Sequence, residues 1–371
     1  MSQFPVEPVE GIYLQSHSVG RPWQGAQQAV SERFFQPWHQ QGEPWGQWLE
    51  GIHRFQAGLA NFIGGEAEQF CPQVNLSSAL TKLLGALEPN PNRPILLMCE
   101  EDFPSMVFVA QQAQSWGWQT RLIPKGSDVT DLAMWHSHLS REDVGLVFVT
   151  QVQSNTGQQA PVQAICGLAR SRGIHTVVDV AQSMGILPMA IDQWQADAVI
   201  GSCVKWLGGG PGAGFIWLCP VLTPQLAPKD VGWFSHANPF EFDPHHFEYH
   251  GEAARFWGGT PSVMPYLLAA YALEQAAEVG IDNIRAHNLA LVDTLIASCP
   301  HWVRSPTEPH RRGGTVIIDP GASLAEVERG LAELKVHYDR RELGLRLSPH
   351  LCNSSEQLQQ VAEVLSALAG K

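Results

Sequence analysis

A lysine and an aspartate follow two short strand-like runs in the middle of the chain. The run His175–Val180 carries Asp179 near its end, and Lys205 comes just after the run Asp197–Ser202. β-Branched and apolar residues bounded by turn residues predict a strand in each run. Because α/β sheets bind their ligands at the rim where strands end, an acid and a lysine placed there can face each other. The pair therefore predicts a single site.

Pyridoxal 5'-phosphate chemistry needs such a pair. A lysine forms a Schiff base with the cofactor, and a carboxylate keeps the pyridine nitrogen protonated so that the ring accepts electrons. Lys205 is the candidate for the first role and Asp179 for the second. Each has an ordinary alternative, a surface lysine before a glycine turn and a helix cap. The run GGGPGAG (208–214) favours the cofactor, because it lets the backbone fold tightly beside a ligand.

Composition and charge exclude several classes of protein. The chain has 371 residues, of which 44% are hydrophobic and 16% charged, and this size allows a large α/β domain with a smaller companion. The net charge of −13 argues against a nucleic-acid or anionic membrane partner, because like charges repel. No apolar run reaches the ~18 residues of a membrane span, and the N-terminus lacks the basic and apolar parts of a secretory signal. We therefore expect a cytoplasmic protein.

Neither cysteines nor histidines predict a metal site. The seven cysteines show no paired C-x-x-C spacing, so disulfides and zinc are not expected. His245, His246 and His250 lie close together, but metal sites usually have a firmer spacing with carboxylates or cysteines. We interpret these histidines as a polar loop.

Strand and helix patterns alternate from residue 95 to residue 218, which predicts a mostly parallel sheet with crossover helices. Two helical patterns and a compact βαββα pattern follow. The predicted strands are 95–100, 144–150, 175–180, 197–202, 212–218, 315–319, 336–339 and 343–347, and the predicted helices are 23–38, 76–87, 104 onward, 161–172, 262–279, 283–298, 323–334 and 355–368. We expect an N-terminal arm (1–22), a large domain (23–250) and a small C-terminal domain (251–371) that includes part of the arm.

Four stretches of the chain resemble a known family. VVDVAQSMG (177–185) and SCVKWLGGGPGAGF (202–215) resemble the class V aminotransferase group of fold-type I pyridoxal phosphate enzymes, which includes kynureninases, cysteine desulfurases, aminotransferases and epimerases. GWFSHANPFEFD (232–243) and RFWGGTP (255–261) resemble kynureninase most. The resemblance covers residues 13–354. It implies an α/β fold with a mostly parallel seven-stranded sheet, a smaller α+β domain, and a homodimer with a shared active site.

The same resemblance implies which residues contact pyridoxal 5'-phosphate. Its phosphate is expected at the turn CPQVN (71–75), because backbone amides at a helix N-terminus favour an anion. Read alone, this turn is an ordinary helix start. Besides Lys205 and Asp179, the implied contacts are Gln73 and Val74 at the phosphate, Phe103 on the ring face, Gln182 at the phenolic oxygen, Ser202 at the phosphate, Trp233, and Thr260 at the phosphate of the neighbouring subunit.

Three residues are candidates for substrate contacts. Arg346 matches the family position that binds the substrate α-carboxylate, and a guanidinium suits a carboxylate because it donates two parallel hydrogen bonds. Asn155 follows the strand pattern 144–150 and is a candidate for the cofactor or the same carboxylate. His17 lies in YLQSHSVG, which the family places near its active site. Without the resemblance, Arg346 reads as a surface residue and His17 as part of a turn.

The reaction stays open among alternatives on the same scaffold. Segments 232–243 and 255–261 favour kynureninase-type hydrolysis of a Cβ–Cγ bond. Departures from the kynureninase pattern favour an aminotransferase or β-lyase; these are Gln73, Met106, Gln182 and Val204. Val204 stands where kynureninases have a tyrosine implicated in proton transfer, so hydrolysis would need another group, with His17 or His236 as candidates.

Two further alternatives are less favoured. A cysteine desulfurase needs a nucleophilic cysteine on a mobile loop, and the segment before Arg346 contains none. A degenerate, non-catalytic homologue that binds the cofactor would not need to keep Lys205, Asp179 and Arg346 together.

Overall fold

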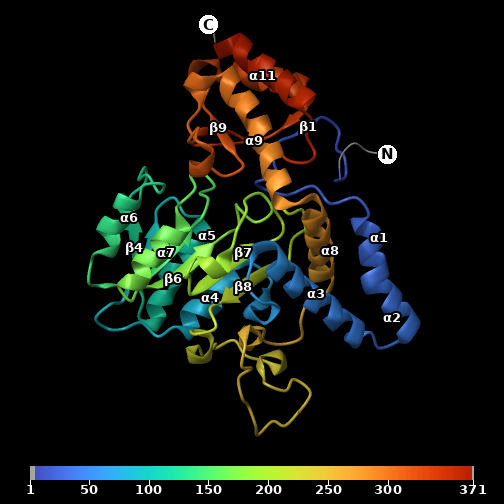
Figure 1. Cartoon of the computed structure of the whole chain (residues 1–371), viewed down its shortest axis with the longest axis vertical. Helices are drawn as coiled ribbons and strands as arrows, with labels where there is room; N and C mark the ends of the chain where they lie inside the picture. Colours follow the sequence, from blue (N-terminus) through green and yellow to red (C-terminus); the bar gives the residue numbers. More distant parts are fainter. Residues whose placement is uncertain (1–4, 370–371) are drawn as a thin grey trace.

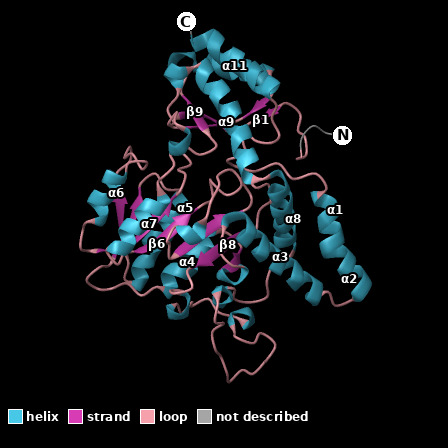
Figure 2. Ribbon diagram, in the orientation of Figure 1, coloured by secondary structure: helices cyan, strands magenta, loops and turns pink. Residues whose placement is uncertain are grey.

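A seven-stranded sheet forms the centre of the molecule in this computed structural model, which describes residues 5–369 except the side chain of Gln41. The first four residues of the predicted arm and the last two of the chain lie outside the described residues. The strand order is β2-β8-β7-β6-β5-β3-β4 (Figures 1 and 2). The strands are β2 (Phe70–Gln73), β3 (Ile95–Cys99), β4 (Gln119–Ile123), β5 (Val144–Thr150), β6 (His175–Asp179), β7 (Ala198–Ser202) and β8 (Gly214–Leu218).

The predicted mostly parallel sheet is confirmed. Strands β4, β3, β5, β6 and β7 run parallel, whereas β8 and β2 are antiparallel to their neighbours. Successive side chains of β3 enter different cores, with Leu96 and Met98 in one and Leu97 and Cys99 in the other. Such strands read as continuous apolar runs because both faces of a parallel sheet are buried.

Helices cover both faces of the sheet (Figure 2). One core contains side chains from α4 (Leu76–Ala86) and α5 (Pro104–Gln112). The helices that contribute to the other core are α3 (Trp45–Ile63), α6 (Leu132–Leu139), α7 (Val162–Ser171) and α8 (Met264–Val279). In residues 5–369, no helix combines the length and apolar character needed to cross a membrane.

The N-terminal helices account for part of the high tryptophan content. The predicted helix 23–38 consists of α1 (Ala26–Val30), a π-helical turn (Ser31–Phe35) and α2 (Gln36–Gln41). Helix α3 was not predicted. The Phe34 and Trp48 rings stack with their centroids 4.9 Å apart, and Trp38 and Trp45 each meet the Trp48 ring edge-on at 5.5 Å. The π-helical turn and α2 therefore pack against α3 through these aromatic rings.

The C-terminal part forms a second unit around its own core (Figure 1). Its elements are α9 (Ile281–Ser298), β9 (Val316–Ile318), α10 (Leu324–Glu333), β10 (Val336–His337), β11 (Asp339–Arg341), β12 (Gly344–Leu347) and α11 (Ser355–Ala369). Strand β1 (Ile12–Tyr13) from the arm pairs with β10, and Ile12 and Leu14 enter this core. Because α8 packs in the core of the large unit, we propose a boundary within α9 rather than at residue 251.

Candidate active site

The ends of β6 and β7 bring Asp179 and Lys205 to one cavity. The two strands are parallel neighbours, with Asp179 opposite Ile200, so both side chains leave the sheet at its carboxyl edge. The cavity has a volume of about 350 Å³ and lies between the two units. The predicted residues in its lining are His17, Phe103, Asp179, Gln182, Ser202, Lys205 and Arg346.

Lys205 lines the cavity with an amine whose pKa is shifted. Burial lowers its pKa from the ordinary 10.5, although the Asp179 carboxylate acts in the opposite direction. A lysine with a lowered pKa presents more neutral amine, which is the form that adds to a carbonyl. Its Nζ lies 5.8 Å from the centroid of the Phe103 ring, which is 47% exposed. An exposed aromatic ring beside a buried amine is suited to hold a flat ligand that the amine can reach.

Asp179 and Gln182 line the same cavity as Lys205. Burial raises the pKa of Asp179, while the hydrogen bond that its Oδ1 accepts from the Ala181 N–H at 2.7 Å lowers it. Gln182 Nε2 donates to the His17 carbonyl at 3.1 Å, and its Oε1 accepts from Trp206 Nε1 at 3.1 Å. One amide hydrogen of Gln182 therefore remains for a ligand, and its contact with the cofactor stays a prediction.

The N-terminus of α4 supplies the anion-binding part of the cavity. Asn75 caps this helix, because its Oδ1 accepts from the Ser78 N–H at 2.8 Å. Asn75, Leu76 and Ser77 line the cavity, together with Ser202. The first amides of a helix lack intrahelical acceptors and carry the positive end of the helix dipole. They favour a phosphate at this position.

The predicted phosphate contacts Gln73 and Val74 do not line the cavity. Gln73 pairs with Gly214 of β8, and its Nε2 donates to the Phe256 carbonyl at 3.1 Å. Val74 is 51% exposed and lies outside the lining. The structure therefore favours Asn75 to Ser77, a position slightly later in the chain than the predicted one.

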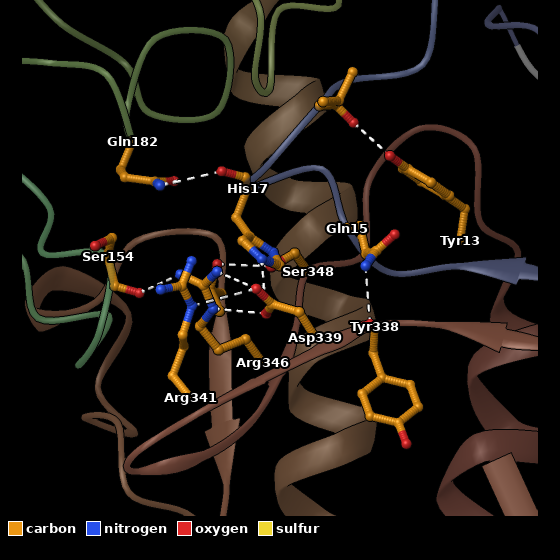
Figure 3. A network of polar contacts seen from close by, with 12 residues as sticks. Tyr13, Gln15, His17, Ser154, Gln182, Tyr338, Asp339, Arg341, Arg346 and Ser348 are labelled. Carbon is orange, nitrogen blue, oxygen red and sulfur yellow. Dashed lines mark hydrogen bonds and ion pairs between the residues drawn. The ribbon is translucent and has the colours of Figure 1, made fainter. Parts of the chain in front are cut away.

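Arg346 is fixed by an ion pair with Asp339 (Figure 3). Strands β11 and β12 set the two residues opposite each other. Arg346 Nε donates to Asp339 Oδ1 at 2.7 Å, its Nη2 donates to Oδ2, and its Nη1 donates to the Ser154 carbonyl at 2.9 Å. A guanidinium has five N–H donors. Two therefore remain for a carboxylate ligand, and Arg341 adds a second cation to the same wall.

His17 supports this ion pair instead of facing the cavity with a free nitrogen. Its Nε2 lies 3.0 Å from Asp339 Oδ1, and its Nδ1 lies 2.7 Å from Ser348 Oγ. Burial lowers the pKa of His17, although the hydrogen bond to Asp339 opposes this shift. An ionised carboxylate only accepts, so the neutral ring donates through Nε2 and accepts the Ser348 hydroxyl at Nδ1. Burial raises the pKa of Asp339, but hydrogen bonds from Arg346 and His17 outweigh this and hold it well below its usual range.

Three other predicted residues lie outside the lining of this cavity. Asn155 does not line it, whereas its neighbour Ser154 does. Trp233 packs among aromatic rings, with Trp45 at 6.4 Å and Phe240 at 5.7 Å between centroids. Thr260 is exposed. These three contacts stay predictions.

Sequence reasoning missed several residues of the site. Asn75, Ser77, Ser105, Ser154 and Arg341 line the cavity, and Asp339 holds Arg346. The sequence did contain a signal for Asp339. A hairpin between the predicted strands 336–339 and 343–347 sets this acid opposite Arg346.

Comparisons with known proteins identify relatives with different reactions. The family described as Aminotransferase class-V matches residues 76–317. An uncharacterised aminotransferase of Bacillus subtilis (strain 168) is 27% identical over 331 residues, covering 86% of this chain and 85% of that protein. A kynureninase of Deinococcus radiodurans is 31% identical over 300 residues, covering 78% and 71%. A cysteine desulfurase structure from Thermococcus onnurineus NA1 superposes with a TM-score of 0.83 at 18% identity, covering 97% and 95%.

Asp339→Asn should destabilise the protein, because it leaves a buried guanidinium without its charged partner. We expect a loss of about 1–3 kcal/mol in the free energy of unfolding, measured by urea denaturation near neutral pH. The pKa of Asp339 is lower in the folded protein than its ordinary 3.8, so this stabilisation is complete above pH 3.8 and declines as the pH falls below it. The control Asp319→Asn breaks an exposed pair with Arg304 and should cost less. Equal losses would contradict the role given to Asp339.

Proposed function

The chain belongs to the aminotransferase class-V family, and from this premise we propose that it is a pyridoxal 5'-phosphate enzyme acting on an L-α-amino acid by kynureninase-type cleavage. In this reaction water adds across the Cβ–Cγ bond of a kynurenine-type substrate, which leaves alanine and an anthranilate-type product. The observation that carries the proposal is the meeting of Lys205, Asp179 and Arg346 in one cavity.

The cavity residues fit the cofactor at three places. Lys205 offers a buried amine, the Phe103 ring offers an open face, and the start of α4 offers amides for a phosphate. When bound, pyridoxal 5'-phosphate supplies an electron sink for negative charge at Cα. Asp179 holds a proton on the pyridine nitrogen, and the resulting ion pair offsets the burial of its carboxylate.

The remaining steps belong to side chains that position the substrate and move protons. Arg346 directs its two remaining N–H donors to the α-carboxylate, and Arg341 strengthens the positive field there. This orientation would set Cα near Lys205, whose amine would take and return the Cα proton. The ion pair with Asp339 keeps the guanidinium from turning away, so the carboxylate is bound without reorganisation.

Support for kynureninase-type cleavage comes from segments 232–243 and 255–261 and from the 31% identical relative. A specific observation favours a second candidate, an aminotransferase or β-lyase. In the described part of the chain no tyrosine lines the cavity, both nitrogens of His17 are engaged, and His236 lies outside the lining. Lys205 alone provides the proton transfers that chemistry at Cα requires.

Other reactions receive less support. Among the described residues no cysteine lines the cavity, and burial raises the pKa of the Cys352 thiol to about 12, which disfavours a desulfurase. A non-catalytic homologue would not need a buried lysine, an aspartate and an arginine arranged around one cavity. We further propose a homodimer, because Thr260 lies outside the lining of its own cavity.

Lys205→Ala should abolish covalent cofactor attachment. Wild-type protein is expected to be yellow when loaded. Borohydride should remove this absorbance and leave the cofactor attached to one peptide, whereas Lys205→Ala should show no labelled peptide in mass spectrometry. The control is Lys229→Ala, a lysine outside the cavity lining. Because burial lowers the pKa of Lys205, the rate of cofactor uptake by apoprotein should rise with pH and level off below pH 10.5. A labelled lysine in the Lys205 variant would contradict the assignment.

Product analysis separates the two candidate reactions. With cofactor-loaded enzyme, L-kynurenine should give anthranilate and alanine in equal amounts, followed by absorbance and chromatography. Asp179→Asn should lower this turnover by at least about 100-fold while some cofactor remains bound. Keto acid or pyruvate formation from a panel of amino acids, with no anthranilate at high enzyme concentration, would instead establish the second candidate.

Mixed dimers test the shared site. Lys205→Ala and Thr260→Ala proteins, each poorly active alone, should regain activity when unfolded, mixed and refolded together. At equal amounts, random pairing makes about half of the dimers mixed, and each mixed dimer has one restored site of two. We therefore expect about a quarter of wild-type activity. A fully active monomer in sedimentation velocity would disprove the shared site.

A further inference from the structure

Two histidines and a glutamate meet on a loop outside the candidate active site. Residues 236–249 form a loop that projects from the large unit at the bottom of Figure 1. The loop is closed by an antiparallel bridge between His236 and Tyr249 and by a hydrogen bond from the Ala237 N–H to the Glu248 carbonyl at 2.9 Å. His236, Glu241 and His246 point their polar atoms toward one another within this loop.

The distances in this cluster are close to those of a metal site. Glu241 Oε2 lies 3.0 Å from His236 Nε2, and Glu241 Oε1 lies 2.9 Å from His246 Nδ1. The three ligand atoms all lie within 4.8 Å of one another. Ligand atoms around a tetrahedral Zn²⁺ are about 3.4 Å apart, given bonds of about 2.0–2.2 Å. Small side-chain movements would therefore admit an ion.

The His236 ring is already held in a fixed orientation. Its side chain is only 10% exposed, and it stacks on the Phe247 ring with centroids 5.6 Å apart. Its Nδ1 lies 2.8 Å from the Glu248 carbonyl oxygen, and the Glu248 N–H points at the same nitrogen at 3.0 Å, so an unprotonated Nδ1 would accept from this amide. If Nδ1–H donates to the carbonyl, the Nε2 lone pair faces Glu241 and is free to bind a metal, as is usual for metal-binding histidines. In the other tautomer Nε2–H donates to Glu241 and no ion is needed.

We propose that His236, Glu241 and His246 bind one divalent transition-metal ion, with Zn²⁺ the best-matched ion and water as its fourth ligand. Two imidazoles and a carboxylate suit Zn²⁺ better than Mg²⁺ or Ca²⁺, which prefer oxygen ligands throughout. The site is independent of the proposed reaction. This conclusion departs from the sequence-based interpretation of a plain polar loop, because Glu241 had not been considered as a partner of the histidines.

The ion would brace a loop that carries exposed aromatic side chains. Phe240 is 54% exposed and Phe242 is 72% exposed, and both flank Glu241. Trp233 meets the two rings at 5.7 and 6.1 Å between centroids. A metal ion bound by Glu241 and the two histidines would link three points of the loop. It would keep the two phenylalanine rings against Trp233, because metal binding removes the loop conformations in which these rings move away.

Zinc binding tests the proposal directly on the untagged, full-length, cofactor-loaded protein. After removal of metals by a chelator, a titration with Zn²⁺ against a chromogenic chelator should show one ion per chain, confirmed by elemental analysis. Glu241→Gln and His246→Ala should each weaken binding at least about tenfold. The control His245→Ala removes a neighbouring histidine outside the cluster and should bind as wild type does.

Hydrogen exchange provides a second measurement. Zinc should slow amide exchange across residues 237–248 in the wild type and in His245→Ala, but not in His246→Ala. The proposal is overturned if the wild type binds no zinc at micromolar concentrations, or if the Glu241 and His246 variants bind it as tightly as the wild type. In either case the cluster is a hydrogen-bonded triad of the other His236 tautomer.

Discussion

Parallel pairing between β6 and β7 is the constraint on which the candidate site depends. It places the ends of both strands at one rim, so Asp179 and Lys205 meet although neither is near the other in sequence. The same pairing buries both groups. Burial raises the pKa of Asp179 and lowers that of Lys205, so each group is shifted toward its neutral form. A ligand with a basic nitrogen and a carbonyl is the natural complement of this pair.

The second unit completes the cavity through contacts that join it to the sheet. Arg346 donates to the Ser154 carbonyl after β5, and Gln182 donates to the carbonyl of His17, which comes from the N-terminal arm. Asp339 makes burial of the guanidinium tolerable, because an unpaired charge in this position would be strongly destabilising. Movement between the two units would break both links together.

Local patterns predicted the sheet and the meeting of Asp179 and Lys205 at its rim, whereas features set by tertiary contacts were missed. Apolar runs and turns marked the strands that carry Asp179 and Lys205. Helix α3 was missed because its glycines lower helix propensity. In the fold it packs on α8, where a Cβ at Gly51 would displace the Leu267 side chain. The position of Asp339 depends on the pairing of β11 with β12, and the proposed phosphate position depends on Asn75 being the cap residue.

The cavity is lined by several cationic side chains, whereas the chain as a whole is negatively charged. The net charge of −13 repels anions in general. Lys205, Arg341 and Arg346 nevertheless line one cavity together with Asp179, where Asp339 pairs with both arginines and the start of α4 adds positive potential. A phosphate at one end and a carboxylate at the other would compensate this local excess. The acidic surface disfavours polyanions, whereas the cationic side chains of this cavity favour small anionic groups.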